Sequence, residues 1–396
     1  MDDTLLLEGC PTLPLPFDDR SVTVVVLRHD HAGIPPAERL SVLCEARRVL
    51  RPGGELRVVV DDDDEAELLR LADLLGMRPP DDGLAARPRP ANRTMRLHKP
   101  ERRATESPSV SLAIPAYSPR FFERCLASAI AQTHANLEII VCDDSPGGEI
   151  EEITQRLAGA RQVTYLRNPV RLRGRGNYAK CFAVAGGEFI KFLNDDDVLA
   201  PECVQRLVDA FRRAPDIVLA TSYRQRIDES GGTLEDQPAT RPLVDRDMIV
   251  HGISLANVML MAGLNVVGEP TTTLFRKCDL QQAIPVDFRF DSPDCIGVID
   301  MAMWTPMLLK GDAVYLREPL SRFRIHSGQQ QHDPAIQQPT VRAIRNLQAR
   351  WLALGLHARL APQQLLARPF PDTGGPWQAQ SLSLPRPQPA IPRWWT

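Results

Sequence analysis

The chain has 396 residues, of which 43% are hydrophobic and 24% are charged, and its formal net charge is −3. This length and apolar content allow a sizeable buried core and favour two domains over one. The nearly neutral charge, with no segment dominated by Lys and Arg, gives no electrostatic reason to expect a nucleic-acid partner.

The cysteines and the apolar stretches indicate the compartment. Eight cysteines are scattered without paired short spacing, which is typical of reduced, buried thiols. The N-terminus has no basic region followed by an apolar core, and the longest apolar stretch, 253–268, is interrupted by Asn257 and Asn265. These features predict a cytoplasmic protein without a membrane-spanning segment.

Residues 1–100 alternate between predicted strands and helices. We expect strands at 22–27, 56–60 and 94–98 and helices at about 40–50 and 65–75. Arg51-Pro52-Gly53-Gly54 is expected to end the first helix before the next strand. The order indicates a small α/β unit.

The stretch LPLPFDDRSVTVVVLRHDHAGIPPAERLSVLCEARRVLRPGGELRVVV, residues 13–60, resembles the C-terminal half of class I methyltransferases. In that family a Gly-rich strand-to-helix turn binds S-adenosylmethionine, and only 21 residues precede Val22 to supply it. We therefore interpret residues 1–100 as a truncated methyltransferase-like module rather than as a working methyltransferase.

A second α/β pattern follows a polar linker at 101–108. Strands are predicted at 110–114, 137–142, 163–166 and 188–193, and helices at about 122–133 and 201–211. Beyond this domain, at 109–330, we expect a helical extension at 331–367 with a helix at 341–354. Residues 368–396 are rich in Pro, Gln and Ser and are predicted to be disordered.

The strand at 188–193 is followed by three consecutive aspartates, Asp195, Asp196 and Asp197. Carboxylates at the carboxyl end of a strand are hard oxygen ligands that suit Mg²⁺ or Mn²⁺, and such a metal is typically shared with substrate phosphates. An acidic run alone is weak support, because residues 61–64 are also four aspartates after a Val-rich strand. We assign that second run to solvent.

Three separated stretches together resemble the family 2 glycosyltransferases, whose fold is called GT-A. They are VSLAIPAYSPRFFERCLASAIAQTHANLEIIVCDDSPG, GNYAKCFAVAGGEFIKFLNDDDVLAPE and IDMAMWTPMLLKGDAVYLREPLSRFRIHSGQQ. The likeness covers 109 to about 328. It implies an α/β, Rossmann-like mixed-sheet domain that binds a nucleotide sugar.

The resemblance also implies which residues bind the donor. They are Pro115, Ala116, Tyr117, Asp143, Asp144, Asn177, Lys180, Asp195 and Asp196. A carboxylate at a strand end can accept a hydrogen bond from a uracil imide or a ribose hydroxyl, and an adjacent aromatic ring can cover the base. Two alternatives stay open: the pair at 143–144 as a turn or helix cap, and Lys180 as a solvated helix lysine.

For the metal, Mn²⁺ or Mg²⁺, the resemblance implies Asp197 as a ligand, although Asn194 stands where the usual Asp-x-Asp pattern begins. His326 is a second candidate ligand for the metal or for phosphate, with a structural histidine as the alternative. The catalytic base implied by the family is Asp300, which also suits a helix N-cap. The preceding position, usually acidic, is Ile299.

These residues lead to an expected function. We expect a metal-dependent, inverting glycosyltransferase that moves a hexose or related sugar from a nucleoside diphosphate sugar, a UDP-sugar being favoured, to a hydroxyl acceptor. A glycan, a lipid-linked glycan or a protein is a possible acceptor, in cell-surface glycan biosynthesis. Because Asn194 and Ile299 depart from the family pattern, a non-catalytic nucleotide-sugar-binding or scaffold module is the alternative. The sequence leaves the oligomeric state open.

Overall fold

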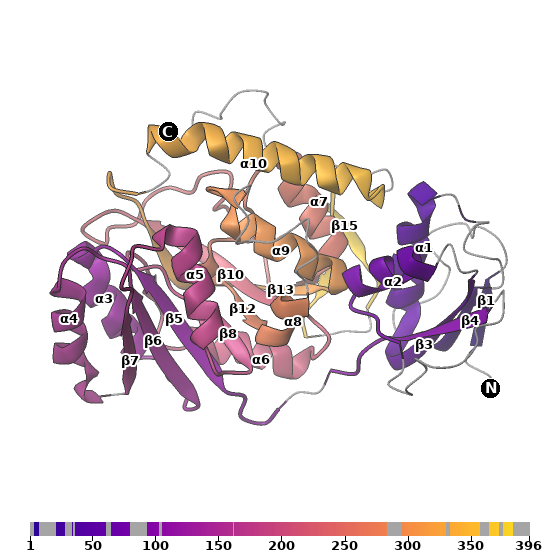
Figure 1. The fold of residues 1–396 in the computed structure, drawn as a ribbon, viewed down its shortest axis with the longest axis horizontal. Helices are drawn as coiled ribbons and strands as arrows, with labels where there is room; N and C mark the ends of the chain where they lie inside the picture. The colour runs from indigo at the N-terminus through magenta and orange to yellow at the C-terminus, as the bar shows by residue number, and fades with distance from the viewer. Residues whose placement is uncertain are drawn as a thin grey trace. The chain divides into compact units, whose positions relative to one another are not determined.

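The computed structural model describes residues 4–7, 21–27, 34, 36–60, 65–79, 93–102, 105–160, 162–282, 295–329, 333–356, 364–371 and 375–382. The chain forms two compact units, one of residues 1–103 and 349–361 and the other of residues 104–348 and 362–396 (Figure 1). Among the described residues, no helix combines the length and the apolar character needed to cross a bilayer.

The smaller unit contains a four-stranded sheet in the order β1-β2-β3-β4, formed by Thr4–Leu7, Val22–Leu27, Leu50–Val60 and Arg93–His98. The first three strands are parallel, and β4 is antiparallel to β3. Helices α1 (Pro36–Val49) and α2 (Glu65–Leu74) separate the strands along the chain. Strands β2 and β4 and both helices lie close to their predicted positions. Strand β1 was not predicted, and residues 51–54, which were expected to form a turn, belong to β3. The likeness to methyltransferases stays a prediction, and the acidic run at 61–64 lies outside the described residues.

The larger unit contains a mixed sheet of eleven described strands in the order β15-β14-β11-β13-β10-β12-β8-β5-β6-β7, with β9 paired to β13. The strands are β5 (Val110–Ala116), β6 (Leu137–Asp143), β7 (Val163–Arg167), β8 (Phe189–Phe192), β9 (Val198–Leu199), β10 (Leu219–Ile227), β11 (Met248–Val250), β12 (Leu274–Arg276), β13 (Ala313–Arg324), β14 (Gln364–Pro369) and β15 (Gln378–Ser381).

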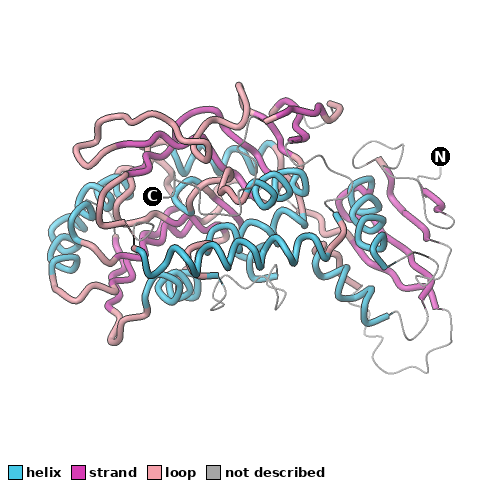
Figure 2. The backbone as a smooth tube through the Cα atoms, turned by 90° about the horizontal axis from the view of Figure 1, so that it is seen from above, coloured by secondary structure: helices cyan, strands magenta, loops and turns pink. Residues whose placement is uncertain are grey.

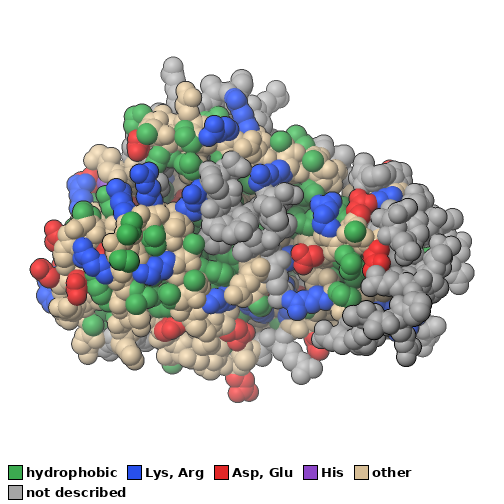
Figure 3. Space-filling model, in the orientation of Figure 1, with side chains coloured by type: hydrophobic (Ala, Val, Ile, Leu, Met, Phe, Trp, Pro, Cys, Tyr) green, Lys and Arg blue, Asp and Glu red, His purple; other side chains and the backbone are tan. Residues whose placement is uncertain are grey.

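The helices of this unit are α3 (Pro119–Ile130), α4 (Glu149–Leu157), α5 (Arg173–Val184), α6 (Cys203–Arg213), α7 (Gly252–Ala262), α8 (Lys277–Gln282), α9 (Ile299–Lys310) and α10 (Pro334–Ala353). Figure 2 shows helices beside the strands of the sheet. On the face seen in Figure 3, Lys and Arg side chains are spread among hydrophobic ones.

Strands β8, β5, β6 and β7 are parallel neighbours. Residues of β5 and β8 are buried almost throughout, because helices cover both faces of a parallel sheet. The register pairs Ala116 with Asp143 and Ala113 with Phe192, so the carboxyl ends of β5, β6 and β8 lie at one edge. The loops that follow these three strands therefore meet there, as is usual for ligand sites in α/β proteins.

Helices α7, α9 and α10 lie close together in this unit (Figure 1). The first residue of α7, Gly252, has no room for a side chain: an added Cβ would lie 2.0 Å from the carbonyl oxygen of Gly311, just after α9. Gly263 ends α7 with a φ of 63°, a conformation that favours glycine. These glycines let the helices approach closely.

Two strands lie near the C-terminus. Strand β14 spans the boundary between the predicted helical extension, 331–367, and the predicted disordered tail, 368–396, and β15 lies within that tail. Both extend the sheet beyond β11 by antiparallel pairing, and Leu365 and Ala367 are fully buried. Backbone hydrogen bonds to the edge of an existing sheet thus order residues 378–381, whose composition alone favours disorder. Residues 383–396 lie outside the described residues.

Candidate functional site

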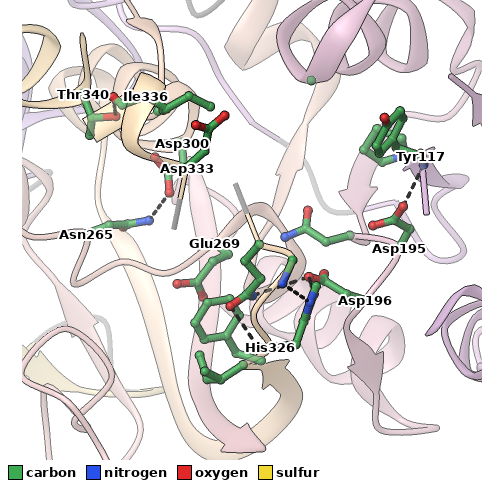
Figure 4. A pocket seen from close by; sticks show the side chains of 18 of the residues that line it. Tyr117, Asp195, Asp196, Asn265, Glu269, Asp300, His326, Asp333, Ile336 and Thr340 are labelled. Carbon is green, nitrogen blue, oxygen red and sulfur yellow. Dashed lines mark hydrogen bonds and ion pairs between the residues drawn. The ribbon is translucent and has the colours of Figure 1, made fainter. Parts of the chain in front are cut away.

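A pocket of about 790 Å³ opens where the loops after β5, β6 and β8 meet. This volume is within the range of small-molecule and cofactor sites. Tyr117, Asp144 and Asp196 line it from the strand ends, while Asp300 and His326 line it from elements far away in the sequence. The fold thus places residues expected to bind the nucleotide sugar and the expected catalytic carboxylate in a single cavity (Figure 4).

Asp195 fixes the loop after β5. Its Oδ2 accepts hydrogen bonds from the backbone amides of Tyr117 and Ser118, each at 2.7 Å (Figure 4). Burial, followed by the neighbouring Asp196, raises the pKa of Asp195 to about 7. The ring of Tyr117 is 44% exposed, and the guanidinium of Arg171 lies 4.5 Å from its centroid. This pair forms a flat, cationic platform that suits a nucleotide.

Asp196 and His326 form a close pair that faces the pocket. The Oδ2 of Asp196 lies 3.1 Å from the Nε2 of His326, and both side chains keep some exposure (Figure 4). Arg324 holds the acidic turn in place, because its Nε donates to the backbone oxygen of Asp196 at 2.8 Å. A carboxylate oxygen and an imidazole nitrogen, both atom types that bind metal ions, therefore lie side by side on a turn that Arg324 holds in place.

Asp197, which the family likeness implied as the metal ligand, is fully buried and does not line the pocket. Its carboxylate accepts hydrogen bonds from the hydroxyl of Thr271 at 2.7 Å and from the backbone amide of Arg324 at 3.0 Å. Burial, with the neighbouring Asp196, raises its pKa well above the usual range. The side chain joins the turn after β8 to η3 (Pro270–Thr272) and to the end of β13.

Of the two aspartates at the end of β6, Asp143 and Asp144, only Asp144 lines the pocket. Its carboxylate accepts hydrogen bonds from the backbone amides of Leu172 and Arg173, at 2.7 and 2.8 Å, and from the side chain of Asn168. Arg173, with a φ of 60°, begins α5 in a left-handed conformation that this bond helps to hold. Asp144 therefore holds in place the loop at 171–173, whose two arginines line the pocket.

Asp143 and Lys180 point to other partners. Asp143 is fully buried and accepts hydrogen bonds from the Tyr165 hydroxyl at 2.6 Å and from the Ser145 amide at 2.8 Å. The Nζ of Lys180 donates to Asn168 at 2.6 Å. Neither residue is in the pocket lining. Both side chains therefore support neighbouring residues of the site and do not face the pocket.

The other predicted donor residues surround the same loops. Pro115 and Asn177 line the pocket, while Ala116 is buried below it. The side-chain amide of Asn177 donates to the backbone oxygens of Ala116 and Cys142, at 3.2 and 2.8 Å. Asn177 thus ties the ends of β5 and β6 together from α5.

Asp300 enters the pocket from the first turn of α9. Its Oδ2 accepts a hydrogen bond from the Nδ2 of Asn265 at 2.5 Å, and its Oδ1 accepts one from the amide of Met301 at 2.7 Å. The orientation of the Asn265 amide is set by Gly268, whose N–H donates to Oδ1 at 3.0 Å. Burial outweighs these bonds and raises the pKa of Asp300 to about 6.

Several lining residues were not predicted. Arg171 and Arg173 belong to a basic run that the sequence shows, but its link to the aspartates depends on the loop. Arg224 and Glu269 form an ion pair at 2.6 Å across the region 223–298, where the sequence has little pattern. Because these two residues are far apart in the chain, no local sequence pattern indicates that they pair.

Among the described residues, no group of three or more His, Cys, Asp or Glu side chains is arranged to hold a metal ion. The pair Asp196 and His326 offers two ligands. Mg²⁺ is usually held by one or two carboxylates, and substrate phosphates and water complete its coordination. Carboxylates suit Mn²⁺ as well. Asp196 supplies one such carboxylate for a metal shared with a bound diphosphate, and the imidazole of His326 lies beside it.

Part of this chain is similar to known glycosyltransferases. The model of "Glycosyl transferase family 2" matches residues 111–264. "Uncharacterized protein MT1568" of Mycobacterium tuberculosis is 31% identical over 225 residues, covering 54% of this chain and 66% of that protein. "Uncharacterized glycosyltransferase alr2836" of Nostoc sp. is 28% identical over 225 residues, covering 55% and 65%. The matched part therefore spans just under two thirds of these two relatives.

Two further likenesses are more partial. The chondroitin synthase of Escherichia coli is 29% identical over 132 residues, which cover 33% of this chain and 19% of that protein. Among solved structures, S. aureus TarS 1-349 in complex with UDP-GlcNAc superimposes with a TM-score of 0.49 at 14% identity, covering 63% of this chain and 71% of that one.

Proposed function

We propose that this chain, whose residues 111–264 match the family 2 glycosyltransferase model, is a glycosyltransferase that transfers a sugar from a nucleoside diphosphate sugar to a hydroxyl acceptor. The observation that carries the proposal is that one pocket holds the Asp196–His326 pair and, apart from it, the carboxylate of Asp300. The pair is proposed to hold the metal that binds the leaving diphosphate, and the separate carboxylate is proposed to accept the proton of the acceptor hydroxyl. The named chondroitin synthase relative supports a role in glycan biosynthesis.

The donor is proposed to bind along the loops after β5, β6 and β8. Its base lies against Tyr117 and Arg171, and a UDP-sugar is the first donor to examine. Its diphosphate extends toward Asp196 and His326, which are the proposed ligands of Mn²⁺ or Mg²⁺ in place of Asp197. When bound, the metal neutralises the charge that develops on the departing diphosphate.

Asp300 is the proposed general base. Its carboxylate takes the proton of the acceptor hydroxyl while that oxygen attacks the anomeric carbon, and a single displacement inverts the configuration there. A pKa near 6 leaves the group mostly ionised at neutral pH, yet more basic than an ordinary aspartate. Asn265 and the Met301 amide hold the carboxylate in a fixed orientation.

The proposal is tested by incubating the purified chain with a panel of nucleotide sugars, with Mn²⁺ and with a chelator. We expect one donor to raise the melting temperature in the presence of Mn²⁺ and to be hydrolysed slowly without an acceptor. Binding with neither hydrolysis nor transfer would support the alternative, a non-catalytic nucleotide-sugar-binding module.

The nucleotide platform yields a second prediction. Removing the ring in Tyr117→Ala is expected to raise the donor KM by roughly 5- to 150-fold, because base–aromatic stacking is worth about 1–3 kcal/mol. Tyr117→Phe keeps the ring and is the matched control, with a KM close to that of the parent. Equal KM values for the Ala variant and the parent would place the base elsewhere in the pocket.

A further inference from the structure

One wall of the pocket has no role in the donor chemistry. It comes from α10, which lies beyond the residues that match the family model. Ile336, Gln337, Thr340, Val341 and Ile344 line the pocket, and their spacing places them on one face of the helix. Figure 4 shows Ile336 and Thr340 on the side of Asp300, away from Tyr117 and Asp195.

Close contacts fix this wall in place. Gly297, two residues before α9, has a φ of 76°, and a Cβ added to it would lie 2.0 Å from the Thr340 hydroxyl. At the end of α7, a Cβ added to Gly263 would lie 3.5 Å from Ile344. The side chain of Gln348 donates to the backbone oxygen of Leu260 at 2.7 Å. The same turn that leads into Asp300 therefore touches α10 directly.

The chemistry of the wall is mainly aliphatic. Ile336, Val341 and Ile344 offer only hydrocarbon, and the hydroxyl of Thr340 donates to the Ile336 backbone oxygen at 2.8 Å within the helix. Gln337 is the other polar side chain among the described lining residues of this face. A ligand against this wall gains mostly from burying apolar surface.

Charge restricts the ligand further. Asp300 and Asp333 are carboxylates on this side of the pocket (Figure 4). Glu269 is a third, and it pairs with Arg224 at 2.6 Å, so that this guanidinium is already engaged by an anion. Arg226 also lines the pocket, so three carboxylates face two guanidiniums. This excess of negative charge disfavours an anionic acceptor head, whereas a neutral hydroxyl compound meets no such repulsion.

We propose that the space between Asp300 and the α10 face is the acceptor subsite, and that it takes a neutral hydroxyl compound carrying an aliphatic segment. The inference rests on the proposed function. In the transfer, the acceptor oxygen forms a bond to the anomeric carbon, the bond from that carbon to the phosphate oxygen breaks with its electron pair on the diphosphate, and the hydroxyl proton passes to Asp300.

The test uses the straight-chain alcohols from methanol to hexan-1-ol as acceptors, with the donor that the chain hydrolyses. The measured quantity is the ratio of alkyl glycoside formed to donor hydrolysed, at equal alcohol concentration. We expect this ratio to rise by up to about fourfold per added methylene, the gain for a fully buried CH₂ group. The rise should stop once the chain fills the subsite.

Variants of α10 connect the trend to the wall. Ile344→Asp is expected to flatten the series, because the measured ratio is normalised to donor hydrolysis by the same variant. Its thermal unfolding curve shows whether the variant is folded. Ile336→Ser is a milder second variant that should reduce the slope. Gln338→Ala, on an exposed position of the same helix, is the matched control and should keep the parent slope.

The outcomes separate the two proposals. A flat series in the parent, with donor hydrolysis intact, overturns the aliphatic acceptor subsite and leaves the proposed function standing. A rising series that Ile344→Asp does not change moves the subsite away from α10 and overturns the inference. Absence of both hydrolysis and transfer with every donor overturns the proposed function and the inference with it.

Discussion

Asp196→Ala is expected to lower metal-dependent transfer by roughly a thousandfold or more and to leave the free energy of unfolding within about 1 kcal/mol of the parent. The metal contributes several kcal/mol of charge stabilisation in the transition state, and each 1.4 kcal/mol is a factor of ten in rate. Asp196 faces the pocket beside His326, so few buried contacts are lost. Transfer rates at graded Mn²⁺ concentrations and a denaturant titration measure both effects.

Asp197→Ala is the informative comparison, since this carboxylate is buried. Its removal leaves the Thr271 hydroxyl and the Arg324 amide without their acceptor, at a cost of about 1–3 kcal/mol for each unsatisfied group. We expect a large loss of stability, with activity following the folded fraction. If Asp197→Asn is instead stable but loses its response to Mn²⁺, while Asp196→Ala stays active, the ligand is Asp197 as the family likeness first implied.

Asp300→Asn is expected to reduce kcat for transfer by about 10²- to 10⁴-fold, the usual contribution of a positioned general base. The shape of the side chain is kept, so donor binding and stability should change little. In the parent, the base acts only when ionised. Because burial raises its pKa to about 6, transfer should fall as the pH drops through about 6, provided that the donor is saturating.

Asn265→Ala tests the support of that base. The Asn265 amide donates to the carboxylate and so favours its ionised form, which lowers the pKa against the effect of burial. Without it, the pKa of Asp300 should rise, and the acid limb of the pH–rate profile should move to higher pH. Asn136→Ala, at an exposed site, is the control. An acid limb that stays in place, or that moves to lower pH, would contradict the assignment of Asp300.

The part of the fold that follows from local pattern was accessible from the sequence. Strands β5 and β6 and helix α3 have the apolar periodicity and the turn residues of their type, and parallel strands necessarily bring their carboxyl ends to one edge. For that reason Tyr117, Asp144 and Asp196, which the family resemblance implied as donor residues, lie near one another. The resemblance also implied Asp300, which lies at the start of a helix as expected.

The direction of each side chain within a turn was not accessible. Asp195, Asp196 and Asp197 are adjacent, yet one holds the loop of Tyr117, one faces the pocket, and one bonds to Thr271, 74 positions away. Which does which depends on partners that approach from distant elements. The contribution of α10 to the pocket could not be predicted for the same reason. Its sequence is that of an ordinary amphipathic helix, and its place in the pocket depends on contacts with the end of α7 and the turn before α9.

Asp195 gives the donor site a further property. One oxygen of this carboxylate receives both amides of the loop that carries Tyr117, while the next residue along the chain is Asp196. With the cation at Asp196 and the nucleotide at Tyr117, as proposed, ordering either residue helps to order the other, and we expect the two ligands to be thermodynamically linked. Such linkage is reciprocal: whatever factor the cation adds to nucleotide affinity, the nucleotide returns to the cation.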